Sequence, residues 1–259
     1  MRKRAAVGES LIVERIGAVT LLTINRPHRS NALDAATSAA IDSEIDAAET
    51  DAAVGAVIIT GKGDRAFCSG MDMKEAAAIG IGHGLVPGRG FAGITERRRA
   101  KPLIAAVNGA AVAGGFEIAL ACDIVVAADH ALFGLSEVKR GLFAYAGGIQ
   151  RLARQVPRAT ALAMILTGEL VAAARLYDLG VVSEVVPGER LGDRALELAQ
   201  AILANNWEAV RNGKLLHDMA ADMPVDQALR FGAAFGNATL ASVEGREGVA
   251  AFADRRAAP

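Results

Sequence analysis

The sequence predicts an α/β fold whose C-terminal part is helical, and three observations lead to that prediction. Short, continuous apolar runs such as residues 54–60 and 103–107 are typical of buried strands. Glycine-marked helical patterns begin at residues 114 and 147. Beyond residue 158 almost every pattern is helical. Repeated strand–strand–helix units followed by helices favour an α/β architecture.

Composition and charge exclude several classes of protein. The 259 residues are 52% hydrophobic and 22% charged, which supplies a buried core and excludes a disordered or collagen-like chain. Because 28 Lys and Arg oppose 29 Asp and Glu, for a net charge of -1, we expect no nucleic acid partner. No apolar stretch approaches about 18 residues without a charge or a glycine, so we expect no membrane span.

The compartment is predicted from the N-terminal residues and the cysteines. Met1–Arg4 resembles the charged region of a signal peptide, but residues 5–9 do not form the apolar segment that would have to follow. Two cysteines, Cys68 and Cys122, are too few for a disulfide scaffold. We therefore expect a reduced, cytoplasmic protein.

The first fifty residues predict a hairpin and a helix. Residues 11–13 and 19–24 are rich in β-forming side chains, and Gly17 lies between them. Asp34 is placed to cap a helix whose apolar residues recur at a spacing of four, as far as Ile45.

The middle of the chain predicts two buried strands with turns and a loop. The strand at 54–60 ends in the turn at 61–64, and the strand at 103–107 ends in a turn at Asn108-Gly109. Residues 79–93 are rich in glycine and aperiodic, which predicts a mobile loop. The later elements expected are a helix at 116–122 after Gly114-Gly115, strands at 124–128, 132–134 and 181–186, and a helix starting at Gly147-Gly148.

Two glycine-marked turns combine polar residues with backbone N–H groups. The segment 66–75 follows the strand at 54–60, and taken alone an ordinary strand-to-helix loop is its more frequent interpretation. The segment 108–117 starts a helix at Gly114, which leaves N–H donors and the positive end of the helix dipole facing outward. Such donors can hold a phosphate or a developing oxyanion.

Two glutamates follow these turns. Glu117 comes three residues after Gly114 among apolar residues, where a carboxylate is costly unless it is paired or functional. The alternative is a first-turn glutamate favoured by the helix dipole. For Glu137 the alternative is a surface ion pair with Lys139 or Arg140. Together, two N–H donors and two carboxylates are the equipment for stabilising an enolate and moving protons beside a carbonyl.

Several segments, spread in order over roughly residues 10–256, carry a resemblance to a known family. They are Asn25-Arg26-Pro27, Asn31-Ala32-Leu33, 67–74, 101–109, 114–117, 122–124, 133–137, 147–148, 166–168, 180–182 and 247–252. In these segments the chain resembles the crotonase (enoyl-CoA hydratase/isomerase) superfamily. The resemblance implies a spiral of ββα units over residues 1–200 and a C-terminal helical trimerisation region over 201–259, assembled as a homotrimer or a hexamer.

The resemblance also implies a substrate and a site. The substrate would be an acyl-CoA thioester, with coenzyme A as part of the substrate rather than a separate cofactor. The backbone N–H groups of Ser69 and Gly114 would form an oxyanion hole beside Glu117 and Glu137. The residues implied to contact CoA are Arg29, Ala66, Cys68, Gly70, Met71, Asp72, Met73 and Lys74. No metal is implied, and the four histidines lack metal-ligand spacing.

The two glutamates decide which reaction the resemblance implies. Hydratases of the superfamily carry a glutamate at both positions, and isomerases often lack the first. Relatives that displace an aromatic halide use an aspartate in the following loop, which here reads Leu142-Phe143-Ala144-Tyr145-Ala146. The implied reaction is reversible hydration of a trans-2-enoyl-CoA. Glu117 would deprotonate water and Glu137 would protonate the α carbon, and the resting proton belongs to the coupled pair.

Three alternatives stay open, and one departure bears on the acyl group. The alternatives are an isomerase that uses Glu137 alone, an enzyme like carnitinyl-CoA dehydratase, and a non-catalytic acyl-CoA-binding paralogue.

Hydratases commonly have Pro-Gly where this chain has Ala144-Tyr145. An aromatic residue there would narrow the acyl pocket or stack on a ring-bearing acyl group. Phe143 and the 79–93 loop would border the same pocket.

Overall fold

The computed structural model describes the backbone of residues 2–6 and 9–257 and the side chains of residues 9–253. Met1 and residues 7–8, on which part of the signal-peptide comparison rests, lie outside the described residues. The chain divides into two compact units, Met1–Gln200 and Ala201–Pro259. Each unit is described by itself.

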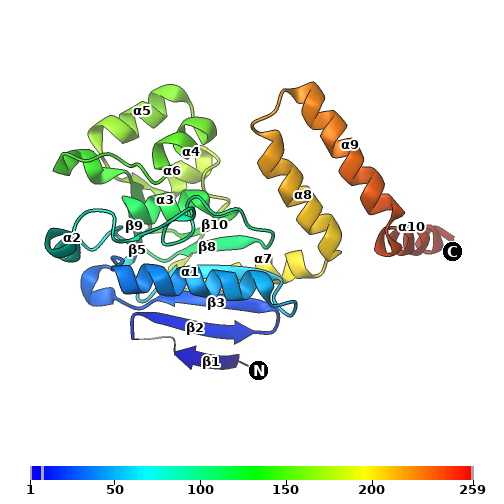
Figure 1. The fold of residues 1–259 in the computed structure, drawn as a ribbon, viewed down its shortest axis with the longest axis horizontal. Helices are drawn as coiled ribbons and strands as arrows, with labels where there is room; N and C mark the ends of the chain where they lie inside the picture. The colour runs from blue at the N-terminus through cyan, green and yellow to red at the C-terminus, as the bar shows by residue number, and fades with distance from the viewer. Residues whose placement is uncertain (1, 7–8, 258–259) are drawn as a thin grey trace. The chain divides into compact units, whose positions relative to one another are not determined.

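The first unit is built on a seven-stranded sheet, with the strand order β1-β2-β3-β4-β8-β10-β13 (Figure 1). β2 is antiparallel to both of its neighbours, β1 and β3, whereas the strands from β3 to β13 run parallel. The strands are β1 (Arg2–Ala6), β2 (Leu11–Ile16), β3 (Val19–Ile24), β4 (Ala56–Gly61), β8 (Leu103–Val107), β10 (Ile124–Ala128) and β13 (Glu184–Val186).

A second, four-stranded sheet has the order β12-β11-β9-β5. β5, β9 and β11 are parallel, and β12 is antiparallel to β11. These strands are β5 (Ala66–Cys68), β9 (Ala110–Val112), β11 (Leu132–Gly134) and β12 (Val171–Ala172). A separate small hairpin pairs β6 (Leu85–Val86) with β7 (Gly90–Phe91).

The chain winds through the two sheets as a spiral. Each turn adds one strand to the large sheet and then one to the small sheet, as β4–β5, β8–β9 and β10–β11 do. A helical segment follows each pair: α2 (Met73–Ile79), α3 (Gly114–Ala121), and the 3₁₀ turn η2 (Ser136–Arg140) with α4 (Gly148–Gln155). The α/β spiral of ββα units is therefore confirmed.

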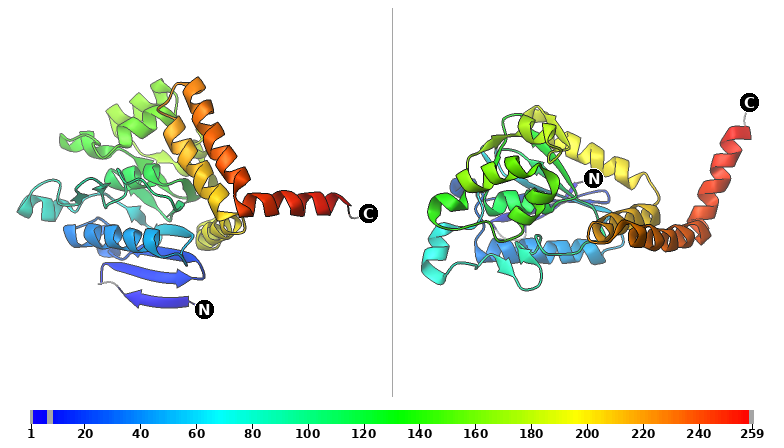
Figure 2. Two further views of the ribbon diagram at one scale, coloured as in Figure 1. Left: turned by 45° about the vertical axis from the view of Figure 1, so that its right-hand side comes forward. Right: turned by 90° about the horizontal axis from the view of Figure 1, so that it is seen from above.

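Apolar strands and α1 (Ala35–Thr50) form much of the core. All five residues of β8 are buried, because this strand lies between β4 and β10 in the large sheet and β5 of the small sheet packs against it. Asp34 caps α1 by accepting a hydrogen bond from Thr37 N at 2.7 Å. α1 contacts β2, β3 and β4, and Figures 1 and 2 show it running along these strands. Ile41 and Ile45 are the buried face of this helix, as the spacing predicts.

The structure differs from the sequence-based expectations mainly at short strands. The hairpin around Gly17 is confirmed. The 79–93 segment, expected to be an aperiodic loop, contains the hairpin of β6 and β7. The strand expected at 181–186 is formed only at 184–186. The sequence analysis missed β1 and β9 altogether.

The remaining helical elements complete the two units. Those before the boundary are η1 (Pro27–Arg29), α5 (Arg158–Thr167), α6 (Ala173–Asp178) and η3 (Gly188–Arg190), and α7 (Leu191–Leu203) crosses it. The second unit holds α8 (Trp207–Ala220), α9 (Val225–Ala241) and α10 (Val243–Ala257). Asn212 Nδ2 donates to Thr239 Oγ1 at 3.0 Å and ties α8 to α9. Across the part of the chain that is described, no helix is long and apolar enough to cross a membrane.

Candidate active site

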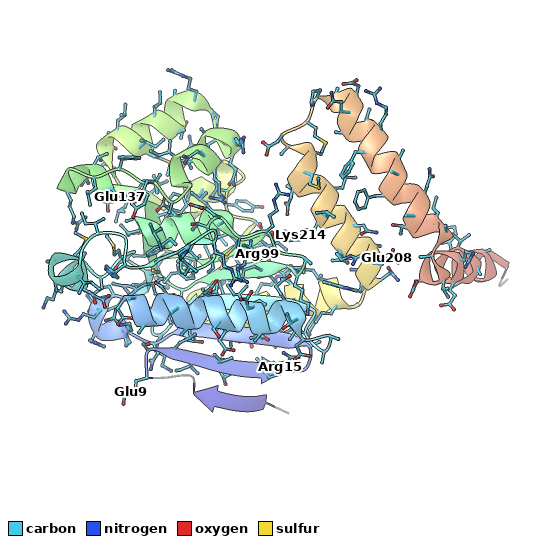
Figure 3. All side chains as sticks on the ribbon, viewed as in Figure 1. Glu9, Arg15, Arg99, Glu137, Glu208 and Lys214 are labelled. Atoms are coloured by element: carbon cyan, nitrogen blue, oxygen red, sulfur yellow. The ribbon has the colours of Figure 1, made fainter. Side chains whose placement is uncertain are left out.

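One cavity of about 360 Å³ in the first unit gathers the segments that the sequence analysis singled out. It lies where the β5–α2 connection, the start of α3, η2 and the loop before α4 meet. Glu137, labelled in Figure 3, belongs to η2. The lining residues from these segments are Ser69, Met71, Asp72, Met73, Lys74, Val112, Ala113, Gly114, Glu117, Ser136, Glu137, Arg140, Leu142, Phe143, Tyr145 and Ala146.

The double glycine that opens α3 lets the helix approach β5 closely. A Cβ added at Gly115 would lie 1.9 Å from the carbonyl oxygen of Cys68, so only glycine fits there. Ala113, just before the helix, has a φ of 53°, a left-handed conformation that costs energy for a non-glycine residue. Its N–H donates to Gly134 O at 2.8 Å, and its carbonyl accepts from Glu117 N at 3.1 Å. These contacts fix the direction of the Gly114 N–H.

The backbone donors beside the cavity differ from those expected. Ser69 N–H donates to Ser30 O at 3.2 Å, so it is already occupied. The next residues form a parallel bridge, in which Gly70 O accepts from Leu33 N and Asp72 N donates to Leu33 O, both at 2.8 Å. In a parallel bridge the central residue points its own N–H to the opposite side. The N–H directed away from the bridge is therefore that of Met71.

The Met71 and Gly114 N–H groups lie close to each other. A Cβ added at Gly70 would lie 3.0 Å from Gly114 N, which places the Gly70–Met71 peptide beside the first turn of α3. Within residues 9–253, neither N–H donates to a protein acceptor. Gly114 is one of the two donors expected, whereas the other free N–H beside it belongs to Met71, which the sequence analysis assigned only to CoA contact, and not to Ser69.

Glu117 lies in the first turn of α3 and is buried, with 3% of its surface exposed. Its Oε1 accepts a hydrogen bond from Gly148 N at 2.9 Å. Burial, with a smaller contribution from the nearby charge of Glu137, raises the pKa of Glu117 from 4.5 to about 7 against the opposing effect of the Gly148 hydrogen bond. Glu117 therefore changes its protonation state near neutral pH.

Glu137 faces the same cavity from η2. Burial raises its pKa as well, and the nearby Arg140 partly opposes that shift. Glu137 Oε2 and Ser136 Oγ are both buried, and neither has a hydrogen-bond partner among the residues described. A buried carboxylate oxygen without a partner is costly, so it is expected to be satisfied by a ligand or a water. Of the two surface ion pairs considered for Glu137, the one with Lys139 is not formed, since Lys139 pairs with Glu169 at 2.7 Å, and Arg140 acts on Glu137 through its nearby charge.

The raised pKa of Glu117 makes the free energy of unfolding depend on pH, and the variant Glu117→Gln tests this dependence. Between pH 4.5 and about 7 the folded chain binds more protons at Glu117 than the unfolded chain does. The free energy of unfolding must therefore fall as the pH rises through this window. We expect Glu117→Gln to be more stable than the unsubstituted chain at pH 8, by about 3 kcal/mol, and similar to it at pH 4.5. Urea denaturation at both pH values measures the difference, and an equal effect at both would refute the shifted pKa.

The residues expected to contact CoA divide into two groups. Arg29, Met71, Asp72, Met73 and Lys74 line the cavity, whereas Ala66, Cys68 and Gly70 do not. The side chains of Ala66 and Cys68 are buried inside the unit because β5 lies between α3 and the strands β4 and β8 of the large sheet. The carbonyl oxygen of Ala66 is occupied by the amides of Asn31 and Asn108.

Asp72 serves the fold as well as the cavity. Its carboxylate caps α2 by accepting from Lys74 N at 3.1 Å and pairs with Arg26 at 2.9 Å. Ile81, Leu85 and Phe91 from the 79–93 segment also line the cavity, as the expected border of the acyl pocket. No group of three His, Cys, Asp or Glu side chains in the described part of the chain is arranged to hold a metal ion.

Comparisons with known proteins agree with this arrangement. The family model described as "Enoyl-CoA hydratase/isomerase" matches residues 14–259. A probable enoyl-CoA hydratase of Rhizobium meliloti is 36% identical over 96% of this chain and 97% of its own length. A carnitinyl-CoA dehydratase of Escherichia coli is 38% identical over 96% of this chain and 97% of its own length.

The solved structures agree as well. The crystal structure of an enoyl-CoA hydratase from Mycobacterium marinum superimposes with a TM-score of 0.90 at 39% identity, covering 96% of this chain and 97% of that one. The match to the family model, the identities and the shared fold all extend over nearly the whole chain. We conclude that this chain belongs to the enoyl-CoA hydratase/isomerase family, within the crotonase superfamily.

Proposed function

We propose that this chain is an enoyl-CoA hydratase, which adds water reversibly across the 2,3 double bond of a trans-2-enoyl-CoA thioester. Members of its family act on acyl-CoA thioesters. The observation that carries the proposal is the meeting, at one cavity, of two glutamates with raised pKa values and two unpartnered backbone N–H groups. A conjugated thioester needs both features to accept water.

In the proposed mechanism, the thioester oxygen accepts hydrogen bonds from the N–H groups of Met71 and Gly114. These bonds draw electron density from the conjugated double bond and stabilise the enolate that forms when water attacks. The N-terminal end of α3 adds the positive end of its dipole at the same place. Because both donors are held by the backbone, little reorganisation is needed during the reaction.

The two carboxylates carry the protons. Ionised Glu117 takes one proton from a water molecule as its oxygen bonds to the β carbon. Protonated Glu137 gives its proton to the α carbon as the enolate collapses. Glu117 ends protonated and Glu137 ends ionised, so dehydration runs the same steps in reverse. The pKa of Glu117, about 7, lets this group accept a proton near neutral pH, and burial raises the pKa of Glu137, which favours the protonated form that donates.

The remaining parts of the proposal concern CoA and assembly. Arg29 and Lys74, on the side of the cavity formed by η1 and α2, supply the positive charge for the CoA phosphates. Coenzyme A enters with the substrate, and the mechanism uses no further cofactor and no metal. We also propose a homotrimer or a dimer of trimers, assembled through the helices of residues 201–259, and a cytoplasmic location.

Dehydration of a 3-hydroxyacyl-CoA is the second candidate, because the chain is 38% identical to a carnitinyl-CoA dehydratase. It would use the same two glutamates in the reverse direction. An isomerase would need only Glu137, which leaves the cost of burying Glu117 without a function. In a non-catalytic acyl-CoA-binding protein, the burial of Glu117 and the burial of Glu137 would both cost free energy without serving a function.

The direct test is the loss of the conjugated enoyl-thioester absorbance when the purified chain is mixed with crotonyl-CoA. We expect turnover in the unsubstituted chain and a loss of about a thousandfold in Glu137→Gln, which removes the proton donor. Binding of CoA thioesters without any loss of absorbance would instead support the isomerase or the non-catalytic protein.

A further inference from the structure

The loop between η2 and α4 carries two aromatic side chains into the reaction cavity. Ala144 and Ala146 are each 3% exposed, whereas Phe143 is 63% and Tyr145 is 46% exposed. This alternation puts both aromatic rings on one side of the loop, where they line the cavity. The rings meet edge to face, with centroids 6.3 Å apart and an interplanar angle of 66°.

Both ends of this loop are attached to the catalytic glutamates. Leu142 N donates to the carbonyl oxygen of Glu137 at 3.2 Å, and Gly148 N donates to Glu117 Oε1 at 2.9 Å. The position of the two rings is thus set by the same contacts that set the carboxylates. Burial and the charge of Glu117 raise the pKa of the Tyr145 phenol, which places this ring near the proton-transfer groups.

The opposite wall is apolar and close to Tyr145. A Cβ added at Gly82 would lie 3.9 Å from the Tyr145 hydroxyl oxygen, so the ring extends across to the 79–93 segment. On that segment Ile81 and Leu85 line the cavity and are themselves exposed. Large apolar side chains left uncovered in a cavity gain free energy when a ligand covers them.

We infer that the acyl pocket selects a thioester whose β carbon carries an uncharged planar ring, rather than a short linear chain. This inference rests on the proposed function, because it places the acyl group beside Glu117 and Glu137. A methyl group on the β carbon is too small to cover both aromatic side chains. A ring there lies between Phe143 and Tyr145 on one side and Ile81 and Leu85 on the other.

The charges that line the cavity bear on whether it suits an uncharged ring or a cationic acyl group. Aromatic side chains also bind quaternary ammonium groups through their π faces. However, Arg140 lines the same cavity, and its positive charge lies near enough to Glu137 to lower the pKa of that carboxyl. A cationic acyl group would meet this guanidinium as well as the two carboxylates, whereas an uncharged ring contacts the aromatic side chains without repulsion between like charges.

The test compares binding with turnover. Calorimetry gives dissociation constants for two saturated thioesters, 3-phenylpropanoyl-CoA and butanoyl-CoA, which bind without reacting. We expect the phenyl thioester to bind at least about tenfold more tightly, and Tyr145→Leu to reduce that preference by about tenfold. Phe143→Leu is expected to reduce it in the same direction. Tyr177→Leu is the matched control, because Tyr177 is an exposed tyrosine of α6 that does not line the cavity.

Turnover is then measured on cinnamoyl-CoA, crotonyl-CoA and a crotonyl-CoA that bears a trimethylammonium group on its terminal carbon. The expected kcat/KM is highest for cinnamoyl-CoA. Equal binding of the two saturated thioesters, a preference that survives Tyr145→Leu, or a higher kcat/KM for the cationic substrate would each overturn the inference. If the ring preference in binding is found and no enoyl-CoA is hydrated, the proposed function fails while the acyl preference stands.

Discussion

Glu117→Gln is expected to lower the rate of water addition to a trans-2-enoyl-CoA by about a thousandfold. The amide can still accept the hydrogen bond from Gly148 N, so the shape of the site is kept while the base is lost. Because water no longer loses its proton as it attacks, the loss is expected in kcat more than in KM. The absorbance of crotonyl-CoA followed at pH 8 measures it.

The control for this variant is Glu44→Gln. Glu44 belongs to α1, its pKa is also raised by burial, and it does not line the reaction cavity. Its substitution is expected to leave the rate of hydration unchanged. If Glu117→Gln hydrates crotonyl-CoA as fast as the control does, Glu117 is not the base. If no hydration is detected in the unsubstituted chain or in either variant, and all three move a double bond at similar rates, the isomerase alternative is the correct one.

Replacing the amide N–H of Met71 with an ester oxygen is expected to lower kcat by about a hundredfold to a thousandfold. The replacement, made by incorporating the α-hydroxy analogue of methionine, removes one hydrogen-bond donor and keeps the side chain. It removes the N–H that points away from the Leu33 bridge, and it also weakens the Gly70 carbonyl oxygen that accepts from Leu33 N. Single-turnover measurement on an enoyl-CoA separates this loss from weaker binding.

The same replacement at residue 69 separates the two candidate donors. The Ser69 N–H donates to Ser30 O, so its loss is expected to cost about 1 kcal/mol of stability and to change kcat little. If the ester at residue 69 caused the larger loss of kcat, Ser69 would be the donor and the assignment of Met71 would be wrong.

Much of the fold follows from local sequence patterns. The strand at 103–107 was predictable because its five apolar residues are bounded by Pro102 and by Asn108-Gly109. The helix after Asp34 was predictable because a capping side chain precedes a helical apolar spacing. β9 was not predictable, since its three residues have no pattern of their own and are held as a strand by β5 and β11.

The two carboxylates and the Gly114 N–H of the candidate site were predictable from the sequence, but the Met71 N–H was not. Glu117 was recognisable as a carboxylate in apolar surroundings after a double glycine. The choice between the Ser69 and Met71 N–H groups depends on which of them pairs with residues 30 and 33, a contact between distant segments. The alternation of hydrogen-bond directions along 69–72 is the signal that identifies Met71, and it becomes visible only when the partner strand is known.

Incubation of cinnamoyl-CoA and crotonyl-CoA with the purified chain in water enriched in oxygen-18 tests the central claim most directly. Mass spectrometry of the thioester is expected to show the addition of one water molecule carrying the heavy oxygen, at the β carbon. A thioester that keeps its mass while its double bond moves would contradict hydration and favour the isomerase. A thioester that is bound and returned unchanged would contradict catalysis by this pair of glutamates altogether.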